Sequence, residues 1–368
     1  MKLRLGVTFI ALALVFFFAN GAVLASPGAS AVAPEAWGAL KTWDGVTTTY
    51  AVYQRTEAYA SPFLITDTRS GDQYTGKESF DMHTLTIYRP ASPGLLLEHR
   101  PVVFFVHGGG WVDGYASWYD FVAQSFTGEQ GWVTVVADYR LTSDQVFLAD
   151  PGCPDVATCN ANSATRVKAA WYPDDLQDVA AALQWTAANI GGNGGNANQI
   201  VVSGHSAGGH LVSLLATHPD YAASLRPAIR AVISTSGAYD MSALVDQPLT
   251  YGDLLRQTFT GGFANNDTRL SEASPSTYIQ AGAHLPPFYV LHCELDMPGF
   301  AEQASEFESK LAAQGFAVAS SYLAGYNHYS EMDAMRDINA APTALIASYI
   351  ESILDLAHPK VYLPLAKR

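Results

Sequence analysis

The segment that most constrains the fold is a serine between two glycines, where an apolar run meets a helical pattern. Ser206 lies in the pentapeptide GHSAG at 204–208, directly after the apolar run 200–203 and before the helical pattern 207–217. A chain that passes straight from a buried strand into a helix must turn sharply, and glycines on both sides relieve the crowding. We therefore predict a strand–turn–helix unit that projects Ser206 at a helix N-terminus, where the helix dipole favours negative charge.

Short apolar runs alternate with helical patterns along most of the chain. The predicted strands are 42–59, 82–88, 102–106, 132–137, 200–203, 231–235, 288–293 and 317–322. The predicted helices are 117–127, 174–189, 207–217, 299–314 and 342–356. Such alternation predicts an α/β fold, with a mostly parallel twisted sheet and helices on both of its faces. Hydrophobic residues make up 49% and charged residues 15%, a composition that excludes intrinsic disorder.

The chain is predicted to hold one folded domain, at 41–357. Residues 26–40 are small and contain proline, so we expect a flexible lead-in. Two insertions, 141–170 and 240–286, interrupt the alternation of strands and helices, and we expect them to form a small lid beside the pocket. The tail 358–368 has no assigned function.

The first 25 residues are predicted to be a secretory signal peptide. Lys2 and Arg4 precede the apolar stretch 5–19, and small residues lead up to Ala25. This order of basic, apolar and small segments is typical of such signals. We expect cleavage after Ala25 and a secreted or periplasmic protein. The alternative is an uncleaved segment, which would be the chain's only contact with a membrane.

The three cysteines are predicted to have different roles. Cys153 and Cys159 lie in a polar stretch with five residues between them, and in an exported protein we expect them to form a disulfide. Cys293 follows an apolar run and is predicted to be a buried thiol. No set of ligands with metal-site spacing surrounds these cysteines, so no metal site is predicted.

A glycine-rich loop at 107–111 follows the predicted strand 102–106. Consecutive glycines allow backbone N–H groups to approach a ligand without interference from side chains. An acyl-transfer reaction needs such donors around the oxyanion of its tetrahedral intermediate. The candidate donors are the amides of Gly109, Gly110 and Ala207.

Other side chains near the loop and the turn are predicted to support the pocket. His107 is expected to hold the glycine-rich loop in place, whereas Trp111 and His205 are expected to line the substrate pocket. His210 flanks the same turn. The predicted chemistry requires no metal and no organic cofactor.

A serine nucleophile needs a base, and the base needs an orienting carboxylate. In this type of sheet the expected chain order is serine, acid and then histidine. His328 lies in the turn-like segment 325–330, after the last predicted strand, and is the predicted base. His284 and His292 are the competitors, and both are predicted to have packing roles because they lie at and inside the strand 288–293.

The predicted acid is Asp296, which follows the strand 288–293. Ligand-facing groups of parallel sheets lie in the loops at the carboxyl ends of the strands. Glu294 is the near alternative. Asp175 and Asp178 precede the serine in a predicted helix, and they are interpreted as helix-surface or structural acids.

The overall charge limits the possible partners. The chain has 20 basic and 34 acidic residues and a net charge of −14. An acidic surface repels phosphate backbones, so nucleic acid is not an expected partner. The sequence leaves the oligomeric state open.

Six motifs make the chain similar to the α/β-hydrolase superfamily, and in particular to its HGG-type esterases. They are HGGGW at 107–111, DYRL at 138–141, GHSAGGH at 204–210, SGAYD at 236–240, ELDMPGF at 294–300 and NHYS at 327–330. The similarity covers about 80–357 and extends to feruloyl-esterase-like and hormone-sensitive-lipase-like carboxylesterases and to kynurenine formamidase. GHSAG, rather than GDSAG, favours the feruloyl-esterase-like and formamidase branches.

The resemblance implies hydrolysis of a carboxylic ester through an acyl-enzyme, with a small-molecule or polysaccharide-linked ester as substrate. The alternative it implies is an amide hydrolase of the arylformamidase or peptidase type that uses the same three residues.

Overall fold

The computed structural model describes residues 33–62, 64–67, 78–142, 170, 172–245 and 267–356. The chain divides into two compact units, Met1–Ser30 and Ala31–Arg368, and every described residue belongs to the second. The predicted signal peptide, Cys153, Cys159, nearly all of the insertion 141–170, the part 246–266 of the insertion 240–286 and the tail lie outside the described residues. Within the described ranges, the structure contains no helix that is long and apolar enough to cross a membrane.

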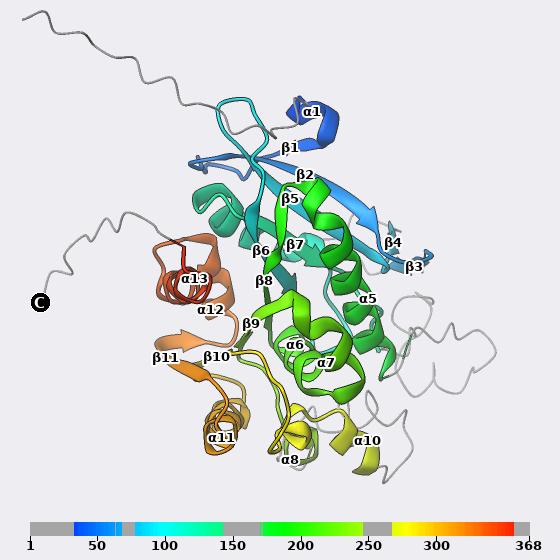
Figure 1. Ribbon diagram of the computed structural model, residues 1–368, viewed down its shortest axis with the longest axis vertical. Coiled ribbons are helices and arrows are strands. Elements are labelled where there is room, and N and C mark those ends of the chain that lie inside the picture. The colour runs from blue at the N-terminus through cyan, green and yellow to red at the C-terminus, as the bar shows by residue number, and fades with distance from the viewer. Residues whose placement is uncertain are drawn as a thin grey trace, which may run out of the picture. The chain divides into compact units, whose positions relative to one another are not determined.

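Nine strands form one sheet in the order β1-β2-β5-β7-β6-β8-β9-β10-β11 (Figure 1). Their bounds are β1 (Ala39–Lys41), β2 (Ala51–Ala58), β5 (Thr84–Ala91), β6 (Arg100–Val106), β7 (Val133–Ala137), β8 (Gly195–His205), β9 (Ile229–Thr235), β10 (Phe288–Leu295) and β11 (Val318–Asn327). From β7 to β11 every pairing is parallel, whereas β1, β2 and β5 extend the sheet by antiparallel pairing. The predicted mostly parallel sheet is confirmed. A separate two-stranded sheet pairs β3 (Leu64–Asp67) with β4 (Glu78–Asp81).

Strand β6 shows why the central strands are apolar at every position. Val102, Phe104 and Val106 pack in one hydrophobic cluster, and Val103 and Phe105 pack in a second. Because successive side chains of a strand point to opposite faces, the two clusters cover the two faces of the sheet. A strand that is buried on both faces has apolar residues at successive positions, without polar residues between them. A continuous apolar run therefore predicts such a strand.

Helices cover both faces (Figure 1). Their bounds are α1 (Pro34–Trp37), α2 (Phe121–Ala123), α5 (Asp174–Asn189), α6 (Ala207–Thr217), α7 (Pro219–Leu225), α8 (Met241–Val245), α10 (Asp267–Glu272), α11 (Phe300–Ala313), α12 (Ser330–Asp333) and α13 (Ala341–Ile353). Residues of α5, α6 and α11 join the first hydrophobic cluster, and residues of α2 and α13 join the second. The predicted helices at 174–189 and 207–217 are confirmed with the same bounds.

The helix predicted at 117–127 is different in the structure. It is divided into a 3-10 helix at Ala116–Tyr119, the short α2 and a π-helix at Gln124–Glu129. Groups of this segment bond outside the helix: the Gly128 carbonyl accepts the Tyr50 N–H at 2.8 Å, and the Ser125 hydroxyl donates to the Met335 carbonyl at 2.8 Å. Tertiary contacts that the local sequence does not reveal therefore override regular α-helical geometry.

Candidate active site

Ser206 lies in a strained turn between β8 and α6. Its backbone has φ 56° and ψ −120°, a conformation that side-chain-bearing residues rarely adopt. A Cβ on Gly204 would lie 2.4 Å from the Gly208 carbonyl oxygen, and a Cβ on Gly208 would lie 2.0 Å from the Val106 carbonyl oxygen. Both positions therefore require glycine, and the predicted strand–turn–helix unit is confirmed.

Ser206, His328 and Asp296 form a hydrogen-bonded row. Ser206 Oγ lies 2.9 Å from His328 Nε2, and His328 Nδ1 lies 2.7 Å from Asp296 Oδ1. The three residues follow β8, β11 and β10, so the parallel sheet brings the carboxyl ends of three strands together. An Nδ1–H that donates to Asp296 leaves Nε2 free to accept the serine proton, which is the arrangement a general base needs.

For Asp296 and for His328, burial and hydrogen bonding shift the pKa in opposite directions. Burial raises the pKa of Asp296, but hydrogen bonds from His328 and Ser236 outweigh it and hold that pKa below its usual value. Burial lowers the pKa of His328 below 6.5, against the opposing hydrogen bond to Asp296. The arrangement favours an ionised aspartate beside a neutral imidazole at neutral pH.

The glycine-rich loop lies directly against the serine. A Cβ on Gly108 would lie 3.1 Å from Ser206 Cβ, and one on Gly109 would lie 1.8 Å from the Asp113 carbonyl oxygen. Gly109 and Gly110 have φ of 129° and 62°, which glycine adopts without a steric cost. Among the described residues no carbonyl accepts the amide N–H of either one. Ala207 is the first residue of α6, so its amide also lacks an intrahelical partner.

Two buried histidines hold the loop. His107 Nδ1 donates to the Gly108 carbonyl at 2.7 Å, and its ring stacks on Tyr139 with 4.4 Å between centroids. Trp111 donates from Nε1 to His210 Nδ1 at 3.0 Å, and His210 Nε2 donates to the Ala273 carbonyl at 2.7 Å. His107 thus has the loop-holding position that the sequence predicts, and Trp111 is anchored to α6.

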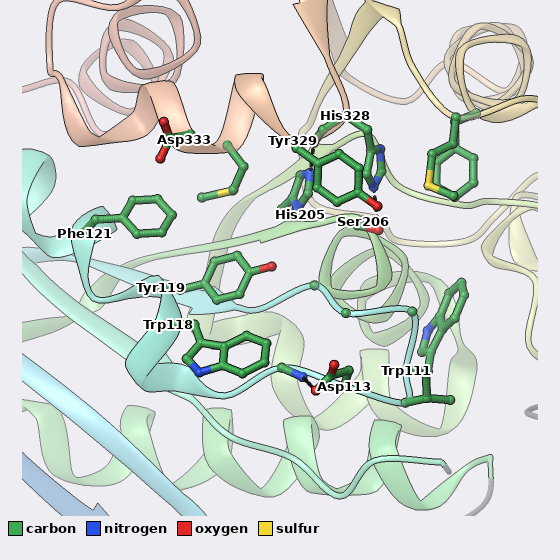
Figure 2. A pocket seen from close by; sticks show the side chains of 18 of the residues that line it. Trp111, Asp113, Trp118, Tyr119, Phe121, His205, Ser206, His328, Tyr329 and Asp333 are labelled. Atoms are coloured by element: carbon green, nitrogen blue, oxygen red, sulfur yellow. Dashed lines mark hydrogen bonds between the residues drawn. The ribbon is translucent and has the colours of Figure 1, made fainter. Parts of the chain in front are cut away.

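A pocket of about 600 Å³ opens above Ser206 (Figure 2). Trp111 and His205, which the sequence places at the pocket, are both among its lining residues. Aromatic side chains form much of the remaining wall: Trp118, Tyr119, Phe121, Phe300 and Tyr329. The volume lies within the usual range for small-molecule sites, and apolar walls with a few polar groups are typical of them.

The competing candidates lie elsewhere. Glu294 is exposed and accepts the Gly325 N–H at 2.8 Å, so it does not orient His328. His284 is exposed, and His292 is half-buried against Tyr322. Of the two acids left open by the sequence, Asp296 alone contacts the base.

Asp175 and Asp178 of α5 are not at the helix surface. Asp178 holds the Arg140 guanidinium through hydrogen bonds of 2.7 and 2.8 Å, and Asp175 is fully buried. Of the two interpretations that the sequence left for these acids, the structural one is therefore correct.

Sequence reasoning missed two polar residues behind the row. The Ser236 hydroxyl donates to Asp296 Oδ2 at 2.5 Å, and the carboxyl group of Glu331 lies nearby with no exposed surface. Ser236 begins the motif SGAYD and Glu331 follows His328 by three residues, so both lie beside quoted motifs. No local sequence pattern at Ser236 or Glu331 indicates that these residues lie close to Asp296.

Among the described residues, two groups of side chains bring possible ligand atoms within 4.8 Å of one another: His205, His328 and Glu331, and Cys293, Asp296 and Glu331. Each group includes a member of the hydrogen-bonded row, whose atoms already bond to one another. We therefore interpret both groups as one polar cluster behind the serine. Cys293 is buried and unpaired by any disulfide, as predicted.

Comparisons with known proteins agree with this architecture. Residues 154–311 match the family model BD-FAE. Over 219 residues the chain is 31% identical to the probable carboxylic ester hydrolase LipM of Mycobacterium tuberculosis, covering 57% of this chain and 44% of LipM. It is 29% identical to esterase LipC of the same organism, covering 58% of this chain and 48% of LipC. The chain thus spans about half the length of these curated relatives.

Solved structures share the fold at low identity. Esterase B from Lactobacillus rhamnosis has a TM-score of 0.60 at 17% identity, with 85% of this chain and 89% of that chain covered. An esterase from Pyrobaculum calidifontis has a TM-score of 0.55 at 22% identity, with 79% and 86% covered. The fold and these matches together confirm that the chain is similar to the HGG-type esterases of the α/β-hydrolase superfamily.

Proposed function

We propose that this protein is a serine hydrolase that cleaves carboxylic esters, with Ser206 as nucleophile, His328 as general base and Asp296 as orienting acid. The observation that carries the proposal is the continuous hydrogen bonding from Ser206 Oγ through His328 to Asp296, at the floor of the pocket. The similarity to proteins named carboxylic ester hydrolase and esterase supports the ester as substrate class.

In the proposed reaction, His328 Nε2 takes the hydroxyl proton as Ser206 Oγ attacks the acyl carbon. Asp296 holds the imidazole in the required tautomer and stabilises the imidazolium that forms. The amides of Gly109, Gly110 and Ala207 donate to the oxyanion of the tetrahedral intermediate. The imidazolium then protonates the departing alcohol, which leaves an acyl-enzyme on Ser206. A water molecule activated by His328 releases the acid in the second half-reaction.

We further propose that the substrate is a small-molecule ester or an ester group on a polysaccharide, and that the protein acts after export. The pocket supports this substrate class, because it has space for an acyl group and aromatic walls that can pack against it. The N-terminal sequence supports export.

The test is a comparison of initial rates on p-nitrophenyl acetate, butyrate and laurate, methyl ferulate and N-formylkynurenine. The matched control is Ser206→Ala, which keeps the fold and removes the nucleophile, and which we expect to lower kcat by up to about 10⁶-fold. Ester turnover that depends on Ser206 supports the proposal. Turnover of the formamide alone moves the protein to the amide hydrolases, and equal rates in both forms contradict the mechanism.

A further inference from the structure

Behind the catalytic row lies a second carboxyl group that the proposed mechanism does not use. Glu331, in α12, has no exposed surface, and neither of its carboxyl oxygens makes a hydrogen bond of ordinary geometry with a described residue. Its Oε1 atom lies 3.5 Å from His205 Nε2, but that nitrogen already donates to the His328 carbonyl at 2.9 Å. Burial without a cation or a close hydrogen-bond donor favours the neutral form of a carboxyl.

The proton of the carboxyl pair belongs on Glu331 rather than on Asp296. Asp296 accepts from three donors: His328 Nδ1, the Ser236 hydroxyl and the Met297 N–H. Within the described part of the chain no lysine or arginine pairs with Glu331. Burial raises the pKa of Glu331 to about 8, while the pKa of Asp296 is lowered. At neutral pH the cluster therefore contains one ionised and one neutral carboxyl.

Ser236 is the group that can connect the two carboxyls. Its hydroxyl donates to Asp296 Oδ2 at 2.5 Å, which leaves its oxygen lone pairs to accept a hydrogen bond from another group. The Glu331 carboxyl faces that hydroxyl and the Cys293 thiol. Ser236 is buried and has φ 45°, a strained backbone for a serine, and its N–H is tied to the Leu291 carbonyl at 2.8 Å.

We propose that Glu331 is a positioning residue of the active site: as a neutral acid it donates to Ser236, which donates to Asp296, and this extends the row to five side chains. The order is Glu331–Ser236–Asp296–His328–Ser206. Each hydrogen bond in such a row polarises the next one. Glu331, at the buried end of the row, therefore orients the Asp296 carboxylate and, through it, the His328 imidazole. This inference rests on the proposed roles of His328 and Asp296.

Deprotonation of Glu331 removes its support for the positions of Asp296 and His328. The ionised form cannot donate to Ser236, and it places a second negative charge near His328. The groups that face Glu331 are His205 from β8, Ser236 and Tyr239 after β9, Cys293 and Asp296 from β10 and the following loop, and His328 after β11. Burial lowers the pKa of His205 to about 4, so His205 is neutral throughout the relevant range. A change near pH 8 in the Nδ1–H resonance of His328 then reports the ionisation of Glu331.

The test compares Glu331→Gln, which keeps an N–H donor of similar shape, with Glu331→Leu, which has none. The first readout is the downfield proton resonance of His328 Nδ1–H, which needs no substrate. We expect it to shift in the unmodified protein with a midpoint near pH 8 and to show no such step in Glu331→Gln. Asp175→Asn is the matched control, because Asp175 is another fully buried carboxyl, with a pKa raised to about 7 by burial, and it should leave the step in place.

The second readout is ester turnover per folded molecule. Glu331→Leu should lower kcat on the order of 5- to 10-fold with little change in KM, the equivalent of about one neutral hydrogen bond, and Glu331→Gln should restore most of it. If Glu331→Leu does not fold, Ser236→Ala interrupts the row between Glu331 and Asp296 and should give the same loss. A pH step that persists in Glu331→Gln, or equal kcat values for the Gln and Leu variants, overturns the inference. A Glu331-dependent step in a protein that turns over no ester overturns the proposed function instead.

Discussion

Two polar clusters of the described structure are built in opposite ways. The triad cluster consists of Ser206, Ser236, Asp296, His328 and Glu331. The Arg140 cluster consists of Arg140, Asp174, Asp178 and His83. In the Arg140 cluster, Asp178 accepts the N–H, Nε and Nη2 of Arg140 at 3.0, 2.7 and 2.8 Å, and His83 Nε2 lies 3.3 Å from the same carboxylate.

The difference lies in charge compensation. The Arg140 cluster holds a permanent cation with its counter-ions, whereas the triad cluster holds two carboxyl groups with no permanent cation beside them among the described residues. A cluster without a fixed cation can stabilise an imidazolium when it forms, which a compensated cluster cannot do as well. Both clusters lie next to sequence motifs, so a motif by itself does not distinguish a reactive site from a structural one.

Replacement of Asp296 in the triad cluster should have the largest predicted effect, a loss of kcat. Asp296→Asn offers His328 Nδ1 an amide that can donate, which favours the wrong tautomer, and we expect kcat to fall about 10⁴-fold with the protein still folded. Steady-state kinetics measure the loss. Glu294→Gln is the control, because Glu294 is exposed and does not contact His328. A similar loss in both variants would contradict the assignment of the acid.

Replacement of Asp178 in the Arg140 cluster should lower the stability of the fold rather than kcat. Asp178→Ala leaves the Arg140 guanidinium without its main partner, and we expect a loss of about 2–3 kcal/mol in the free energy of unfolding, because Arg140 is one-fifth exposed. Thermal unfolding and activity per folded molecule separate the two effects, and the activity should stay unchanged. Asp174→Ala is the control, since Asp174 lies 3.7 Å from Arg140 and is more exposed, so its loss should be small. Loss of kcat in correctly folded Asp178→Ala would remove the distinction between the clusters.

The smallest predicted effect is a shift of the acid limb of activity. In the proposed mechanism the neutral form of His328 is the active one, and burial lowers its pKa, so kcat/KM should fall with acidification at a midpoint below 6.5. In Asp296→Asn the raising influence of Asp296 is lost, so the midpoint should move to still lower pH. Profiles of both forms between pH 4 and 8 measure this. A midpoint above 6.5 in the unmodified protein would contradict this prediction, because it would mean that the hydrogen bond to Asp296 outweighs the burial of His328.

Much of the fold could be predicted because the information is local. The apolar runs predict the central strands, since strands buried on both faces need apolar residues at every position. The ends of some strands were harder to predict: β8 begins at Gly195 and β11 ends at Asn327, each five residues beyond its predicted bound, because these ends are mostly not buried and so no apolar run marks them. The segment Gln124–Glu129 became a π-helix because its groups bond to distant parts of the chain.

The sequence by itself determined the parts of the site whose requirements are steric and local. Gly204 and Gly208 are required by backbone atoms within 2.4 Å of where a Cβ would lie, and this requirement marks the turn that exposes Ser206. The tertiary structure decided between Asp296, the predicted acid, and its alternative Glu294, and it alone brought Ser236 and Glu331 behind that acid. These groups come from separate strands, and their distances depend on how the parallel strands are ordered in the sheet, which no local pattern encodes.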